Sequence, residues 1–208
     1  MNVYYIIGVA GGTSAGKTTI VSKLFDYYGN NRSVIIGQDS YYKHHDELNF
    51  IQRTMVNYDH PDSIDIDLFY SNLINLKNGK KIKKPTYNYK THTRDTSLKL
   101  ITPKKLIFVE GTLVFHFKRL VNLMSIKIFI NAPEKVRFNR RLARDISERG
   151  RDIDSVLKQY KDTVSPMHQK FVKPSKDIAD INISGNIDIE KSVNEIIKSI
   201  DTVLLIGE

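Results

Sequence analysis

The residues with the clearest capacity for chemistry stand in one row: Gly11, Gly12, Thr13, Ser14, Ala15, Gly16, Lys17, Thr18 and Thr19. Up to Thr18 they fit the pattern G-x-x-x-x-G-K-[ST], directly after an apolar run and directly before a helical one. Glycines there let backbone N–H groups turn inward around a phosphate, towards which the next helix directs the positive end of its dipole. Lys17 would reach the β and γ phosphates of ATP, and the Thr18 hydroxyl would bind Mg²⁺. The simpler alternative is a glycine turn that only connects a strand to a helix.

Two acidic residues come just after predicted strands. Asp39 follows residues 33–36 and Glu110 follows residues 105–109. Because parallel strands end at one edge of a sheet, both carboxylates should lie where the phosphate loop opens. Glu110 is expected to bind Mg²⁺ directly or through water, whereas Asp39 would accept a proton from an attacking hydroxyl and also contact the metal. Either acid could instead be a helix N-cap or a first-turn residue.

Residues 133–150 form a predicted helix with two different sides. One side carries the apolar residues Val136, Leu142, Ala143 and Ile146. The other carries Arg137, Arg141 and Arg144, and two further arginines, Arg149 and Arg151, flank Gly150. Guanidinium groups can bind phosphoryl oxygens in a bidentate way, so residues 137–151 are expected to close over ATP as a lid. The alternatives are a solvated basic face and a contact to nucleic acid.

Two segments combine aromatic rings with polar tips, residues 58–62 and residues 87–92. Such side chains can hold a planar base and a ribose. Four lysines precede the second segment and are expected to be solvated charge: Lys80, Lys81, Lys83 and Lys84. The six histidines show no H-E-x-x-H arrangement and have no Cys partners, so no zinc site is expected.

The elements that must position these residues alternate between strand and helix. Short apolar or β-branched runs predict five buried strands, at residues 3–9, 33–36, 105–109, 126–130 and 180–183. Helical spacing of apolar residues predicts helices within 20–28, 66–76, 153–164 and 189–200. This order predicts an α/β fold, a P-loop NTPase-type parallel five-stranded sheet flanked by helices. Residues 79–104 interrupt the alternation and are expected to form a small inserted β-hairpin.

Composition limits the class of protein. The chain has 208 residues, no Cys, and 32 Lys plus Arg against 23 Asp plus Glu, a formal net charge of +9 at pH 7. Disulfide scaffolds and thiolate metal sites are excluded, and residues 1–208 are expected to form one domain. With no export signal and no apolar run near the roughly 18 residues of a membrane span, a cytoplasmic protein without membrane partners is expected. The charge fits either a nucleic-acid binder or a protein whose small ligands are polyanions.

Seven ordered segments resemble the uridine kinase (uridine/cytidine kinase) family, from the phosphate loop to about Ser184. They read GVAGGTSAGKTT, QDSYY, NYDHPDSID, PTYNYKTHTR, FVEGTL, RRLARDISERGRD and QYKDTVSPMHQKFVKPSKDIADINI. The resemblance implies that the γ-phosphoryl group of ATP or GTP is transferred to the 5′-hydroxyl of uridine or cytidine, with Mg²⁺ as cofactor. It further implies that the hairpin lies over the nucleoside, that the chain forms a homotetramer, and that nucleic acid is not a partner.

The same resemblance assigns roles to single residues. It implies that Lys17, Asp39, Arg144 and Arg149 serve catalysis, with Asp39 as the general base, and that Thr18, Asp39 and Glu110 hold the metal. Asp59 matches the carboxylate that grips the ribose hydroxyls, and Tyr87 and His92 match the positions that read the base. The full set of expected substrate-binding residues is Asp59, Tyr58, Tyr87, Tyr89, His92, Arg141, Arg151 and Gln159.

The chain departs from the family pattern at two places. Asn88 stands where Asp is common, which bears on base preference, and Asp177-Ile178 replaces a basic-aromatic pair. Two other functions are compatible with the residues: a kinase for another small alcohol such as pantothenate or ribulose phosphate, and a non-catalytic, ATP-responsive nucleic-acid binder. The lack of an RNP motif disfavours the second of these.

Overall fold

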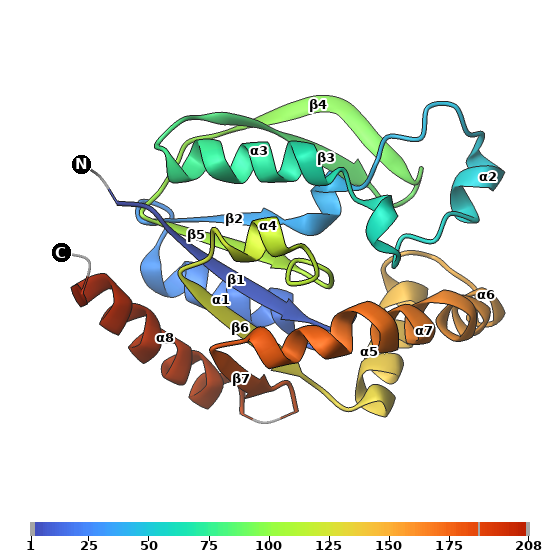
Figure 1. Ribbon diagram of the computed structural model, residues 1–208. Coiled ribbons are helices and arrows are strands. Elements are labelled where there is room, and N and C mark those ends of the chain that lie inside the picture. Colours follow the sequence, from blue (N-terminus) through green and yellow to red (C-terminus); the bar gives the residue numbers. More distant parts are fainter. Residues whose placement is uncertain (1–2, 187, 207–208) are drawn as a thin grey trace.

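The computed structural model describes residues 3–186 and 188–206, and a sheet of five strands lies at its centre (Figure 1). The strands are β1 (Tyr5–Gly11), β2 (Ser33–Gly37), β5 (Leu106–Gly111), β6 (Ile126–Asn131) and β7 (Ile181–Ser184). They are ordered β2-β5-β1-β6-β7 across the sheet, and every pairing is parallel. The predicted five-stranded parallel sheet is confirmed, and its strand ends differ from the expected ones by no more than two residues.

The register of the sheet brings several chain segments to one edge. All seven residues of β1 are buried, as expected for a strand covered on both faces. Val9 of β1 pairs with Glu110 of β5, which also pairs with Gly37 of β2. The carboxyl ends of the three neighbouring strands therefore meet at one place, and the loops that follow them can share a ligand.

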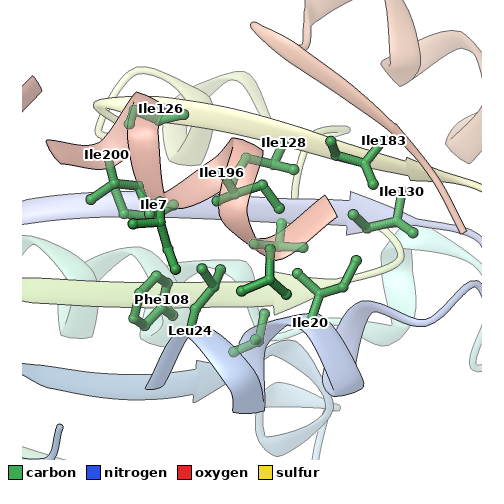
Figure 2. Packing of buried hydrophobic residues seen from close by; sticks show 14 of the residues in the cluster. Ile7, Ile20, Leu24, Phe108, Ile126, Ile128, Ile130, Ile183, Ile196 and Ile200 are labelled. Carbon is green, nitrogen blue, oxygen red and sulfur yellow. The ribbon is translucent and has the colours of Figure 1, made fainter. Parts of the chain in front are cut away.

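Helices cover both faces of the sheet (Figure 1). One face packs against α1 (Lys17–Tyr28) and α8 (Ile189–Ile206). There Phe108 of β5 and Ile128 of β6 lie in one apolar cluster with Leu24 of α1 and Ile196 of α8, as Figure 2 shows.

The other face packs against α3 (Ile66–Lys77) and α4 (Lys118–Val121). Phe69 and Leu73 of α3 are fully buried there against Ile107 of β5. These two cores fix the sheet, and with it the loops at its carboxyl edge.

The remaining helical segments are short, apart from α5. They are the helices α2 (Phe50–Thr54), α5 (Glu134–Ser147), α6 (Ile153–Gln159) and α7 (Ser165–Met167), the 3-10 turns Gln38–Tyr41, Pro61–Ser63 and Lys173–Ile178, and the π-helical turns Tyr160–Val164 and His168–Val172. The predicted helix at residues 153–164 is confirmed as α6 continued by the first π-helical turn. Within the described residues, no helix is both long and apolar enough to span a bilayer.

The predicted hairpin is confirmed as a separate two-stranded sheet. β3 (Ile82–Asn88) pairs antiparallel with β4 (Thr93–Ile101), with an irregularity between Pro85 and Tyr87. β3 packs against α3 and against the turn Gln38–Tyr41 that follows β2. The hairpin is thereby attached beside the carboxyl edge of the main sheet.

The orientation of α5 excludes one of the alternatives for its arginines. Arg137 and Arg141 are buried, with 3% and 7% of their surface exposed, whereas Ile146 is 38% exposed. The side that carries these arginines faces the protein, so the alternative of a solvated basic face is wrong for Arg137 and Arg141. The reason is that the neighbours of this side are backbone carbonyls and carboxylates, which stabilise guanidinium groups better than an apolar core would.

Candidate functional site

The phosphate loop connects β1 to α1 and is built around Lys17. The Lys17 ammonium group is buried and donates hydrogen bonds to the carbonyl oxygens of Gly11 (3.0 Å) and Gly12 (2.9 Å). Gly16, which precedes the helix, has a φ of 104°, a conformation that a residue with a side chain rarely adopts. Burial lowers the pKa of Lys17, while Glu110 and Asp39 oppose this shift. The ammonium group of Lys17 therefore lies against the phosphate loop, at the N-terminus of α1.

Thr18 and Glu110 lie beside each other, as the sequence predicts. The Thr18 hydroxyl donates to both carboxylate oxygens of Glu110, at 3.2 Å and 3.1 Å. Glu110 belongs to β5 itself, so the alternative that it caps a helix is wrong. Burial raises the pKa of Glu110, and the neighbouring Lys17 acts in the opposite direction.

These oxygen atoms fit a magnesium ion that also binds phosphate. Across residues 3–186 and 188–206, no group of three or more His, Cys, Asp or Glu side chains that could hold a metal is found. Mg²⁺ commonly takes only one or two protein oxygens and completes its shell with water and substrate phosphates. The Thr18 hydroxyl and the Glu110 carboxylate, with Asp39 on the same cleft, are the residues that would hold it.

Asp39 lies in the first turn of the 3-10 segment Gln38–Tyr41, directly after β2. The first-turn alternative is therefore confirmed as local structure, and Asp39 nevertheless lines the cleft. Its Oδ2 atom accepts a hydrogen bond of 2.5 Å from the Tyr89 hydroxyl of the hairpin. Asp39 acts on the pKa of Lys17, of Glu110 and of Asp59. Asp39 and Glu110 thus form one electrostatic unit with Lys17.

Asp59 lies just before the turn Pro61–Ser63, and its side chain lines the cleft. Burial raises the pKa of Asp59, an effect that Arg141 opposes. A partly buried carboxylate is suited to accept hydrogen bonds from sugar hydroxyls. This position is the one that the resemblance predicts for gripping ribose.

Aromatic side chains surround the outer end of the cleft. The rings of Tyr58 and His92 are stacked, with centroids 5.8 Å apart and an interplanar angle of 23°, and the Tyr58 hydroxyl donates to the His92 carbonyl oxygen. The ring centroid of Tyr42 lies 5.0 Å from that of Tyr87 and 5.1 Å from that of Tyr58. Tyr42 is an aromatic neighbour that the sequence analysis did not single out. Burial lowers the pKa of His92, and nearby arginines lower it further. Its ring is therefore neutral at pH 7. Such a pocket can take a flat, uncharged base.

A single buried carboxylate organises the arginines of the lid. Asp145 has no exposed side-chain surface. Its Oδ1 accepts from Arg144 at 3.0 Å and 2.8 Å and lies 3.4 Å from Arg149, and its Oδ2 lies 3.3 Å from Arg141 and 3.9 Å from Arg151. Four cations share one anion, so most of their charge remains for other acceptors. This part of the molecule can attract a polyanion such as a triphosphate.

The lid also reaches the phosphate loop. Arg141 donates to Oγ1 of Thr13 at 3.1 Å and to Oε1 of Gln159 at 2.9 Å, and Arg151 donates to the same Gln159 oxygen. Gln159 therefore holds two lid arginines together from α6. The contact with Thr13 joins the lid to the phosphate loop.

One cleft of about 1500 Å³ contains nearly all the predicted site residues. It is lined by residues 13–19, Asp39, Glu110, Asp59, Tyr58, Tyr87, Tyr89, His92, Arg141, Arg144, Arg149, Arg151 and Gln159. Gly11 and Gly12 do not line it; they lie behind the loop and contribute the carbonyl groups that hold Lys17. The cleft joins a phosphate cradle to an aromatic pocket.

The sequence model of the phosphoribulokinase / uridine kinase family matches residues 6–189. The chain belongs to this family. It is similar to uridine kinase of Halalkalibacterium halodurans, with 46% identity over 178 residues, 86% of this chain and 84% of the relative. Uridine kinase of Geobacillus kaustophilus is 41% identical over 199 residues, 96% of this chain and 94% of the relative. Phosphoribulokinase from Rhodobacter spheroides shares the fold, with a TM-score of 0.64 at 14% identity over 88% of this chain and 71% of that one.

In this member of the phosphoribulokinase / uridine kinase family, one lysine differs from the sequence-based expectation. Lys84 is half-buried, lines the cleft, and donates to the Ser40 hydroxyl at 2.8 Å, next to Asp39. Burial lowers its pKa. The expectation of solvated charge is wrong for Lys84, because its side chain points into the cleft, and it is confirmed for the exposed Lys80, Lys81 and Lys83.

Two buried charges of this family member were not given roles from the sequence alone. Arg137 donates from Nε to the Ala132 carbonyl at 3.1 Å, and a Cβ on Gly12 would lie only 2.7 Å from its NH1. Arg137 is therefore packed behind the phosphate loop, where Gly12 permits its close approach. Asp145 was missed as well. The signal for both was present, because Arg137, Arg141 and Asp145 share one helix side at intervals of four residues.

Proposed function

We propose that the protein is a uridine/cytidine kinase, which transfers the γ-phosphoryl group of ATP or GTP to the 5′-hydroxyl of the nucleoside and produces UMP or CMP. The observation that carries the proposal is the cleft that joins the phosphate loop, Asp39 and the aromatic pocket. The curated relatives named uridine kinase match most of the chain and support the same substrate class.

The proposed reaction depends on position more than on nucleophile strength. Phosphoryl transfer has a loose transition state, so Asp39 would orient the 5′-hydroxyl and accept its proton late. Lys17, Arg144 and Arg149 would stabilise charge on the transferred group, and Asp59 would fix the ribose. Tyr58, Tyr87, Tyr89 and His92 would enclose the base, and Arg141, Arg151 and Gln159 would complete the substrate side. When bound at Thr18, Asp39 and Glu110, Mg²⁺ would neutralise charge between the phosphates.

Three further properties belong to the proposal. A homotetramer without nucleic-acid partners is inferred from the resemblance to uridine kinases. A cytoplasmic location is inferred from the need for ATP. Residues 1–208 are proposed to work as one domain, with the hairpin over the nucleoside and residues 137–151 as the lid.

The test is a product assay on a panel of acceptors. We expect ATP-dependent formation of UMP and CMP, and no product from pantothenate or ribulose 5-phosphate. Product from either of these but not from a nucleoside would favour the other alcohol kinase. RNA binding that weakens steeply with salt, without any product, would favour the nucleic-acid binder.

A substitution at the base makes the assay specific. Asp39→Asn keeps the size of the side chain and removes its capacity to take a proton, so kcat should fall by about a hundredfold or more. Asp46→Asn is the matched control, because the Asp46 side chain is 78% exposed in the following loop. Near-normal turnover of Asp39→Asn would remove Asp39 from the role of base.

A further inference from the structure

Three elements meet at Tyr89, which lies in the turn between β3 and β4. Its hydroxyl donates to Asp39 Oδ2, after β2, at 2.5 Å. The guanidinium carbon of Arg149, after α5, lies 4.5 Å from the centroid of its ring. One side chain therefore contacts both the proposed base and an arginine of the lid.

The hydroxyl of Tyr89 is suited to fix a carboxylate. A phenol carries its proton at neutral pH, so the Tyr89 hydroxyl is a donor to the Asp39 carboxylate. A hydrogen bond from a neutral donor to an ionised acceptor is short and directional. With Oδ2 held, the plane of the Asp39 carboxylate is set and Oδ1 can face an incoming hydroxyl.

The ring of Tyr89 is suited to hold a cation. Tyr87 packs against it edge to face, with centroids 5.3 Å apart and an interplanar angle of 81°, which sets its orientation. Arg149 lies over this ring while its NH1 atom is 3.4 Å from Asp145 Oδ1. A guanidinium over an aromatic face is attracted by the ring quadrupole. The lid is thus attached to the hairpin at the ring of Tyr89.

We propose that Tyr89 is a positioning residue with two functions: its hydroxyl aligns Asp39 for the acceptor hydroxyl, and its ring docks the lid through Arg149. This inference rests on the proposed kinase function. It differs from the expected contact between Tyr89 and the nucleoside, because it acts through Asp39 and Arg149. Alignment of the base and closure of the lid then depend on one side chain.

The first arm of the test separates the hydroxyl from the ring. Tyr89→Phe keeps an aromatic face for Arg149 and removes the donor to Asp39. We expect kcat for uridine to fall by about tenfold, while KM for ATP and for uridine stays within about twofold. A kcat within about twofold of the wild type would overturn the alignment of Asp39 by Tyr89.

The second arm measures the lid itself, without turnover. Tyr89→Leu removes the aromatic face, so amide hydrogen exchange in peptides covering residues 144–151 should become several-fold faster than in the wild type and in Tyr89→Phe. Equal exchange in the Leu and Phe variants would overturn the docking of the lid. If Tyr89→Leu does not fold, Arg149→Met removes the same contact from the other side and should give the same faster exchange.

A second tyrosine–arginine pair provides the matched control. Arg119 lies 4.1 Å from the ring centroid of Tyr70, on α3, and neither residue lines the cleft. Tyr70→Phe and Tyr70→Leu should leave both kcat and lid exchange unchanged; changes equal to those of the Tyr89 variants would overturn the proposal. If the wild type phosphorylates no nucleoside, the proposed function fails, and the exchange comparison still decides whether Tyr89 docks the lid.

Discussion

The two ends of the cleft are built in different ways. At the phosphate end, Lys17 is held by the carbonyl oxygens of Gly11 and Gly12, which lie within six residues of it. At the lid end, contacts join side chains that are far apart in the sequence, such as Arg141 with Thr13 and Tyr89 with Asp39. The first end is specified by a short local motif, and the second exists only when distant segments have packed.

The difference extends to freedom of movement. Lys17 is 9% exposed and follows a buried strand, whereas the side chains of Arg144 and Arg149 are both 29% exposed. Long side chains at a partly exposed surface can change partners, while a loop anchored in a packed sheet cannot do so cheaply. We therefore expect the phosphate end to be preformed and the lid end to rearrange when substrate binds.

The largest effect should come from the preformed end. Lys17→Ala removes the cation that the loop holds, and kcat should fall by about a hundredfold to a thousandfold, because no other group is fixed at this point. Steady-state kinetics with uridine will measure it. Lys23→Ala is the control, since Lys23 lies on the same helix and pairs with Glu190 at the surface. If Lys17→Ala lowers kcat less than the lid variants do, the lid end contributes more to catalysis than the phosphate end, contrary to our expectation.

The next effect concerns the buried centre of the lid. Asp145→Asn keeps the shape but leaves four arginines without their shared anion, so kcat/KM for ATP should fall by roughly ten- to a hundredfold. The free energy of unfolding should fall by about 2 kcal/mol or more. Denaturant unfolding and kinetics will measure both.

The matched control for Asp145 is Glu148→Gln, at an exposed acid that follows α5. It should leave both quantities near the wild-type values. If Asp145→Asn retains kcat/KM within about twofold, the lid arginines do not need a common anchor, and the lid end is less interdependent than the structure indicates.

The same contrast explains what could be predicted from the sequence. The phosphate loop and the two acids at the carboxyl ends of β2 and β5 were found because motif, apolar strand and strand end are adjacent in the chain. The strands themselves were found because burial on both faces leaves continuous apolar runs. Local information was sufficient wherever the contacts are local.

The orientation of the arginine helix could not be predicted, for the opposite reason. Apolar residues and arginines lie on its two sides, and Arg137 and Arg141 are the buried ones, because Ala132 and Asp145 offer them oxygen acceptors. A charged side of a helix can be buried only where another segment provides hydrogen-bond acceptors for it. The periodicity of the helix sequence contains no information about that segment. Lys84 and Lys83 show the same point within one strand, where neighbouring residues face opposite sides.

This pair of lysines gives a smaller effect. Lys84→Met keeps the length of the side chain and removes the bond to Ser40 beside Asp39, so kcat should fall by about five- to tenfold. Lys83→Met, on the exposed side of β3, should have no measurable effect. Equal kinetics for the two variants would show that the cleft does not use the Lys84 charge, and the hairpin would then contribute through its aromatic residues alone.

The smallest expected effect is on the free energy of unfolding at low pH. It tests whether burial accounts for the rigidity of the phosphate end. His168 lies behind the loop, in a small cavity that Thr13 and Asp59 also line, and its Nδ1 is buried without a hydrogen-bond partner in the part of the chain that the structure describes. Burial, followed by the charge of Arg137, lowers the pKa of His168 to about 4. The folded protein therefore keeps this ring neutral well below the pH at which the unfolded chain protonates it.

The sign of the pH dependence follows from these two pKa values. Above pH 6.5 the ring is neutral in both states, and its burial carries no charge penalty. As the pH falls from 6.5 towards 4, the unfolded chain gains a proton that the folded protein does not bind, so the free energy of unfolding decreases. Because the ring is partly exposed, we expect a loss of only about 1 kcal/mol at pH 5.

The measurement compares urea unfolding at pH 7 and pH 5 for the wild type and for His168→Gln, which cannot titrate. The variant should lose about 1 kcal/mol less than the wild type between these two values. His44→Gln is the control, since His44 lies in the loop after β2, outside the small cavity behind the phosphate loop. Equal losses in all three proteins would mean that His168 is protonated in the folded state. The region behind the phosphate loop would then admit charge and water as readily as the lid, and burial would not explain the rigidity of that end.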